Sequence, residues 1–127
     1  MEGVKGLIVY KKAFNLSMDI FHIAKKYPSE EKYSLISQIR RSARSVCSNL
    51  AEGYRKRIYT AHFIAKVSDA DMENSETQTW LDFSLACEYI SIEEFSQSNE
   101  VGRLLNHMLH NPEKYVPVSQ KTILTDQ

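Results

Sequence analysis

The stretch Gln38–Gly53 constrains the fold most, because its apolar and polar residues separate at the period of an α-helix. Extended slightly at both ends, it places its apolar and small side chains on one arc of a helical wheel: Leu35, Ile36, Ile39, Ala43, Val46, Cys47, Leu50 and Tyr54. The opposite arc is polar or charged: Arg40, Arg41, Arg44, Ser48, Glu52 and Arg55. This separation predicts a helix with one buried and one exposed face.

The rest of the chain shows the same period with few interruptions. Only four glycines and three prolines occur in 127 residues, and so few helix breakers favour long helices. We expect helices over about 9–26, 33–55, 60–87 and 91–110. Short connections between them predict an all-α, antiparallel up-and-down four-helix bundle over residues 1–111. Residues 112–127 hold two prolines and no helical period, which predicts an extended or poorly ordered tail.

Several residues carry more specific expectations. Ser91, followed three residues later by Glu94, forms the capping box that begins a helix. Gly53, near the end of the second helix, can permit a bend or a frayed last turn. Asn74 and Thr77 interrupt the apolar stripe of the third helix, so they need hydrogen-bond partners if they are buried. The second helix offers three candidate partners: Ser42, Ser45 and Asn49.

The first helix carries more apolar surface than one buried face requires. Phe14, Met18 and Phe21 widen its apolar stripe beyond a single seam. A helix wetted on one side has no need of such side chains. We therefore expect another helix or another subunit to cover them.

The sequence predicts neither a metal site nor a cofactor. Di-iron bundles use Glu-x-x-His pairs on two helices, and this chain has none. The nearest approach is Asp19 with His22, which occurs once. His107 and His110 share a helix face, but their place late in a helix is explained by favourable interaction with the helix dipole.

Catalytic residues are also not expected. Cys47 lies on the apolar arc, where burial raises the pKa of a thiol and makes it inert. No Gly-x-Ser-x-Gly sequence and no glycine-rich phosphate loop occurs. Cys47 and Cys87 are interpreted as reduced packing thiols of a cytoplasmic protein. No apolar run approaches the length of about 18 residues that suggests a membrane span, and no signal peptide is recognisable.

Charge is distributed unevenly along a chain whose net charge is zero. Residues 1–66 contain 13 Lys and Arg against five acids, a net charge of +8, whereas residues 67–127 contain three against 11, a net charge of −8. Such a division suggests either an anionic partner or charge-complementary packing of the chain against itself or a second copy.

Two sets of side chains correspond to these two alternatives. Six cations on or just after the second helix are candidates for binding nucleic-acid phosphates: Arg40, Arg41, Arg44, Arg55, Lys56 and Arg57. Four residues of the third helix are candidates for a subunit interface that would use the same arginines: Asp69, Glu73, Glu76 and Trp80.

The run Ser37–Gly53, SQIRRSARSVCSNLAEG, closely resembles the signature of the four-helix-bundle proteins encoded in intervening sequences of bacterial 23S rRNA genes. The segment Leu7–Ala13 is similar to the opening of that family, with Tyr10 in place of its usual tryptophan. The Tyr27-Pro28 link and the run Glu73–Phe83 also resemble family patterns, so the similarity covers about residues 7–90.

The resemblance implies a bacterial four-helix bundle that forms a ring-like homo-oligomer, with a pentamer known for relatives. It implies no enzymatic activity, and a possible association with rRNA or the ribosome. It also identifies Asn49, Glu52 and Gly53 as candidates for fixing the bundle. This chain is neutral overall, which departs from basic relatives and shifts Arg41 and Arg44 partway from RNA contact toward subunit contact.

Overall fold

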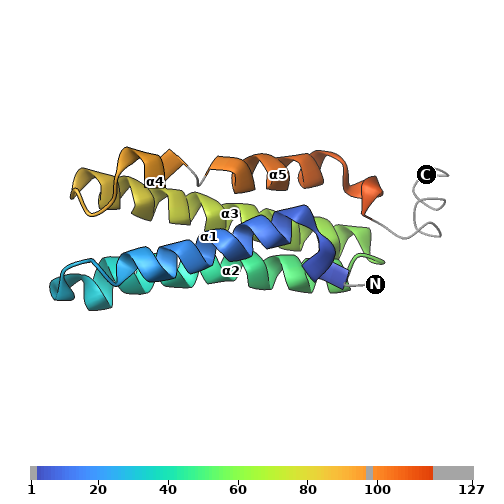
Figure 1. Ribbon diagram of the computed structural model, residues 1–127. Coiled ribbons are helices and arrows are strands. Elements are labelled where there is room, and N and C mark those ends of the chain that lie inside the picture. Colours follow the sequence, from blue (N-terminus) through green and yellow to red (C-terminus); the bar gives the residue numbers. More distant parts are fainter. Residues whose placement is uncertain (1–2, 97–98, 116–127) are drawn as a thin grey trace.

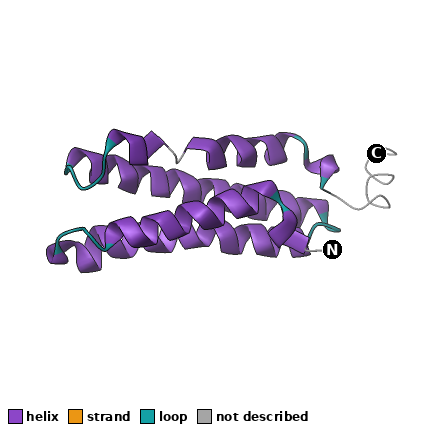
Figure 2. Cartoon of the chain, in the orientation of Figure 1, coloured by secondary structure: helices purple, strands orange, loops and turns teal. Residues whose placement is uncertain are grey.

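Helices account for nearly all of the part of the chain that the structure describes, as the low content of glycine and proline predicts (Figure 2). The computed structural model describes residues 3–96 and 99–115. Its main elements are α1 (Ile8–Ala24), α2 (Ser37–Arg55), α3 (Thr60–Ala86), α4 (Ile92–Ser96) and α5 (Asn99–His110). The first three helices alternate in direction, and α4 and α5 together run back along α3 (Figure 1). The predicted all-α antiparallel four-helix bundle is confirmed.

The sequence predicts the fourth helix of the bundle over residues 91–110. It consists of α4 and α5 on either side of residues 97–98, which lie outside the described residues. The capping box at its start is confirmed. The backbone N–H of Ser91 donates to Glu94 Oε1 (2.9 Å), and the N–H of Glu94 donates to Ser91 Oγ (3.2 Å).

The connection between α1 and α2 is short, and the helix predicted over 33–55 begins as a π-helix. A 3-10 helix, η2 (Ser29–Glu31), leads into a π-helix, η3 (Lys32–Ile36), which continues directly into α2. A second short turn, η1 (Gly3–Gly6), precedes α1. None of the helices in the described part of the chain combines the length and apolarity that crossing a membrane requires.

The core consists of two apolar clusters stacked along the bundle axis. One surrounds Phe63 and Leu50, near the chain termini, and the other surrounds Ile39 and Leu81, near the α1–α2 turn. Buried polar residues of α2 and α3 lie along the same axis: Ser42, Asn74, Thr77 and Ser84.

The predicted partner of Thr77 is confirmed as Ser42. The Thr77 hydroxyl donates to Ser42 Oγ at 2.7 Å and also lies 2.9 Å from the carbonyl oxygen of Glu73. Asn74 is buried too, but its Oδ1 has no hydrogen-bond partner among the described residues. Gly102 leaves room for the Asn74 amide, since a Cβ at residue 102 would lie 3.2 Å from Asn74 Nδ2.

Gly53 has a different role from the predicted bend or fraying. It is buried within α2, where a Cβ would lie only 3.0 Å from Cβ of Lys66 on α3. Glycine therefore permits the close approach of the two helices. Glu52 joins the same pair of helices through its carboxylate, 2.7 Å from Lys66 Nζ. Asn49, by contrast, donates to the Ser45 carbonyl of its own helix (2.9 Å).

Residues 112–115 differ from the extended or poorly ordered tail that the sequence predicts. Pro112–Lys114 form a 3-10 helix, η4, and the ring of Tyr115 stacks on that of Phe63 with their centroids 6.0 Å apart. Residues 112–115 therefore pack against the bundle, because Tyr115 extends the core cluster around Phe63. The remainder of the predicted tail, residues 116–127, lies outside the described residues.

Candidate functional site

The arginines of α2 occupy three different environments, although the sequence places them on one arc. Arg40 is half-buried against α1. Its Nη2 donates to the backbone carbonyl of Phe21 at 2.8 Å, and its guanidinium lies 4.5 Å from the centroid of the Phe21 ring. This arginine joins α1 to α2 and is engaged within the chain.

Arg41 faces α3 and forms an ion-pair cluster with two of the predicted interface acids. Its Nη2 lies 2.6 Å from Glu76 Oε1 and 3.3 Å from Glu73 Oε2. Trp80 Nε1 donates to the same Glu76 oxygen at 3.3 Å. The hydrogen bond from Arg41 lowers the pKa of Glu76 below its usual value, and the two carboxylates raise the pKa of Arg41. The structure thus brings Glu73, Glu76 and Trp80 together with Arg41 of their own chain.

Asp69, the remaining predicted interface residue, lies outside this cluster. It is exposed on α3, close enough to Lys66 to contribute to a raised pKa of that amine, although the hydrogen bond from Lys66 to Glu52 is the larger cause. The pair of Glu52 and Lys66 was not predicted, because the offset between two packed helices cannot be read from either helix alone.

Arg44, Arg55 and Lys56 are exposed, and within the part of the chain that the structure describes none of them has an acidic partner. Arg44 lies 5.9 Å from the Phe21 ring, on the side of α2 that faces α1. Arg57 is half-buried, because its guanidinium covers the Tyr54 ring at 4.0 Å and donates to the Tyr54 carbonyl at 3.0 Å. These four residues keep a positive surface beside α1 and at the C-terminal end of α2.

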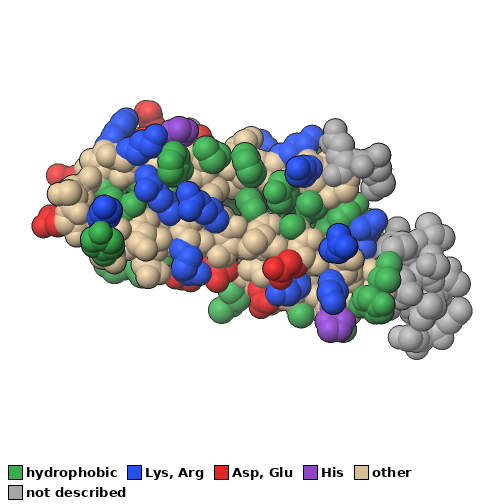
Figure 3. Space-filling view, turned by 90° about the horizontal axis from the view of Figure 1, so that it is seen from below, with side chains coloured by type: hydrophobic (Ala, Val, Ile, Leu, Met, Phe, Trp, Pro, Cys, Tyr) green, Lys and Arg blue, Asp and Glu red, His purple; other side chains and the backbone are tan. Residues whose placement is uncertain are grey.

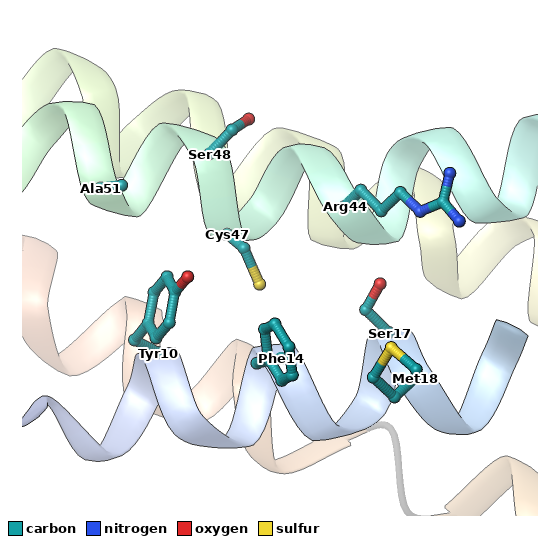
Figure 4. Close-up of a pocket in the computed structure, with 8 residues that line it drawn as sticks. All are labelled: Tyr10, Phe14, Ser17, Met18, Arg44, Cys47, Ser48 and Ala51. Carbon is teal, nitrogen blue, oxygen red and sulfur yellow. The ribbon is translucent and has the colours of Figure 1, made fainter. Parts of the chain in front are cut away.

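A groove of about 320 Å³ lies between α1 and α2 (Figure 4). We call it the α1–α2 groove and define it by eight lining residues: Tyr10, Phe14, Ser17, Met18, Arg44, Cys47, Ser48 and Ala51. The large side chains come from α1, whereas α2 contributes small ones and Arg44. The neighbouring surface hollow, of about 460 Å³, is lined by Lys5, Tyr10, Lys11, Phe14 and Asn15. Figure 3 shows Lys and Arg side chains gathered over this side of the molecule, with apolar side chains between them.

The wide apolar stripe of the first helix, which we expected another helix or another subunit to cover, is only partly covered within the described part of the chain. Phe21 packs under Arg40, but Phe14 and Met18 remain 49% and 40% exposed. The sequence could identify these residues as surplus apolar surface. It could not predict the groove, which depends on the small side chains that α2 places opposite them.

A second hollow, of about 420 Å³, lies on the other side of α2. We call it the η3–α3 groove and define it by seven lining residues: Glu31, Ser34, Leu35, Gln38, Trp80, Phe83 and Cys87. Its apolar walls resemble those of the α1–α2 groove, but its charged residue is an acid. The Ser34 hydroxyl donates to Glu31 Oε1 at 2.7 Å and the Tyr89 hydroxyl donates to Oε2 at 3.0 Å, and these two hydrogen bonds lower the pKa of the Glu31 carboxyl.

The described residues contain no group of three or more His, Cys, Asp and Glu side chains placed to hold a metal ion. Cys47 is half-buried, and burial raises the pKa of its thiol to about 11, as its place on the apolar arc predicted. A thiol with such a pKa is almost entirely protonated at neutral pH and is a poor nucleophile. The side chains around the α1–α2 groove can bind and orient a ligand, and none of them is activated for nucleophilic catalysis.

Comparisons with known proteins agree with the sequence resemblance. The family model described as 23S rRNA-intervening sequence protein matches residues 5–111. A crystal structure from Bacteroides thetaiotaomicron VPI-5482, described as a protein with unknown function from the S23 ribosomal protein family, is similar to this chain. Its TM-score is 0.71 at 29% sequence identity, and the alignment covers 81% of this chain and 96% of that chain. No match is found among curated proteins. These comparisons indicate no enzymatic family.

Proposed function

This chain belongs to the 23S rRNA-intervening sequence protein family, and we propose that it is a non-enzymatic cytoplasmic protein that associates with rRNA through the basic side formed by α1 and α2. The observation that carries this proposal is the set of exposed cations without acidic partners among the described residues: Arg44, Arg55 and Lys56. Cations that are not neutralised by the fold remain available for phosphate oxygens.

The distribution of acidic residues also favours the side formed by α1 and α2 as the RNA-binding side. Between Thr60 and Ala86, α3 carries five acids and a single Lys or Arg, Lys66, whereas α2 carries four arginines and one acid. A polyanion is therefore attracted to α2 and α1 and repelled from α3. Because Arg40 and Arg41 are engaged within the chain, we restrict the proposed contact to Arg44, Arg55 and Lys56, together with Lys5 of η1 and Lys11 of α1.

Salt dependence of RNA binding tests this proposal. We expect the intact chain to bind labelled 23S rRNA fragments at low ionic strength, with an affinity that falls steeply as salt rises. The triple variant Arg44→Ala, Arg55→Ala, Lys56→Ala should reduce the slope of log K against log[salt] by about 2–3, near one per lost phosphate contact. Arg41→Ala is the matched control, because its guanidinium is already paired with acids. Absence of binding at about 50 mM salt would refute the proposal.

The second candidate function is that of a structural scaffold, in which copies of the chain associate through their helix faces. Its support is the exposed apolar surface on two sides of α2, at Phe14 and Met18 and at Phe83, together with the opposite charges of α2 and α3. Glu73 and Glu76 are engaged with Arg41, so an intermolecular ion pair would use Arg44 and the exposed Asp69 instead. A ring of identical copies, a pentamer by the resemblance, is the expected assembly.

Light scattering distinguishes this candidate. A homo-oligomer held by such contacts should lose mass on Arg44→Glu and recover it when Asp69→Lys is added in the same chain. A wild-type protein that stays monomeric at high concentration excludes self-association and leaves the rRNA proposal unaffected.

A further inference from the structure

The α1–α2 groove is open because large side chains on one helix face small ones on the other. On α1, Phe14 and Met18 are about half-exposed. On α2, the opposite wall is made by Cys47, Ser48 and Ala51, which are too short to fill the space. A volume of about 320 Å³ lies within the usual range for small-ligand sites of roughly 300–1,000 Å³.

Phe14 gives this groove a flat aromatic surface. Its ring stacks on that of Tyr10, with an interplanar angle of 27° and a centroid separation of 6.3 Å. Figure 4 shows the two rings rising from α1 toward α2, with the Cys47 sulfur above them. Ser17 and Ser48 lie along the same groove and provide hydroxyls. A planar group with polar edges, such as a nucleobase, fits this combination.

The charges around Phe14 indicate an occupant with repeated negative charges. Arg44 lines the groove, and Lys5 and Lys11 line the adjacent hollow, which also contains Phe14. Neither lining includes an acid. A fatty acid or lipid has its charge at one end and would need cations at one end only. Cations on both sides of an aromatic ring match a strand whose phosphates flank a base.

We propose that the α1–α2 groove binds an unpaired base of single-stranded RNA, which stacks on Phe14 while its flanking phosphates contact Arg44 and Lys11. This inference rests on the proposed rRNA association and narrows it to unpaired nucleotides. Bases within a duplex are stacked on one another and cannot enter the groove, whereas bases in loops and single strands are free to do so.

The η3–α3 groove is an internal control for this proposal. It is apolar and slightly larger, at about 420 Å³, and its Phe83 is 55% exposed, close to the 49% of Phe14. Its lining contains Glu31 and no Lys or Arg, so it repels a phosphate backbone. Identical changes at Phe14 and Phe83 therefore remove similar exposed aromatic surface from one cationic and one acidic groove.

Fluorescence anisotropy with a labelled single-stranded oligoadenylate tests the proposal on the intact chain. Phe14→Ala should weaken binding on the order of tenfold, as expected for the loss of one base–aromatic stack. Phe14→Leu should weaken it similarly, because leucine keeps the apolar surface but has no flat face. Phe83→Ala should bind as wild type. A duplex of the same length should bind more weakly and should not respond to Phe14→Ala.

The outcomes separate the two proposals. If Phe14→Ala and Phe14→Leu bind as wild type while Arg44→Ala binds more weakly, the base site is refuted and rRNA association stands. If the wild type binds neither strand, both proposals fail. Light scattering on the same variants provides the remaining outcome. A lower mass for Phe14→Ala would show that the groove holds a second copy of the chain, which overturns the base site.

Discussion

Helix α2 packs against α3 along one seam and against α1 along another, and the two seams consist of different side chains. Toward α3, helix α2 presents Gly53, which permits close approach, and Ser42, whose hydroxyl meets Thr77. Toward α1, it presents Cys47 and Ala51, and the larger side chains opposite them leave a groove rather than closing it. Ion pairs to Glu76 and Lys66 further join α2 to α3. The α2–α3 hairpin therefore provides cohesion, whereas the α1–α2 side retains exposed apolar surface.

The same substitution at each seam provides the strongest test of this contrast. Phe63→Ala removes a ring that is 1% exposed and should destabilise the protein by about 3–5 kcal/mol. Phe14→Ala removes a ring that is 49% exposed and should cost no more than about 1 kcal/mol. Urea denaturation followed by circular dichroism measures both. Equal losses would contradict the assignment of cohesion to α2–α3.

A double-mutant cycle at Ser42 and Thr77 should give the next largest effect. Thr77→Val removes the hydroxyl that donates to Ser42 Oγ, and it should cost about 0.5–1.5 kcal/mol, because the Ser42 hydroxyl keeps its own bond to the Ile39 carbonyl (3.3 Å). The double variant Ser42→Ala, Thr77→Val should cost less than the sum of the single changes, because either single change already removes the hydrogen bond between the two hydroxyls. Strict additivity would show that the two hydroxyls are not coupled.

Arg41→Ala should have the smallest effect and should depend on pH. The cluster is more than a third exposed at Arg41, so we expect a cost of about 0.2–1 kcal/mol at pH 7. Arg41 lowers the pKa of Glu76 below 4.5. Its stabilisation is therefore complete above that pH and is lost as the pH falls through the lowered pKa.

Arg44→Ala is the control for this prediction, since Arg44 has no acidic partner among the described residues. Its free energy of unfolding should equal that of the wild type at every pH. Urea midpoints measured between pH 7 and about pH 3 compare the two variants. A cost of Arg41→Ala that persists at the acidic limit would show that the ion pair is not its source.

The sequence predicted the local features of the fold well. The end of α2 at Arg55, the start of α3 at Thr60 and the capping box of Ser91 agree with the structure. Each of these features depends on the helical period or on two residues three positions apart. Such signals can be recognised without knowing which other helix packs nearby. The pairing of Thr77 with Ser42 was also accessible, because a buried hydroxyl requires a partner.

Contacts between side chains of different helices were less predictable from the sequence. The exposed arc placed Arg40, Arg41 and Arg44 together, but α1 covers the first, α3 binds the second and only the third remains open. Helical period fixes the angle of a side chain about its own helix, whereas its partner depends on the offset and spacing of the next helix. Gly53 was misread for the same reason, since the close approach of α3 is not a property of α2 alone.

The hydroxyl pair of Thr77 and Ser42 has one further consequence. Two amphipathic helices displaced by one turn, about 5.4 Å, can still face each other with apolar side chains. In this bundle such a slip would separate the buried hydroxyl of Thr77 from that of Ser42. The hydrogen bond between the two hydroxyls therefore favours one register of the α2–α3 hairpin among several that the hydrophobic effect alone would accept.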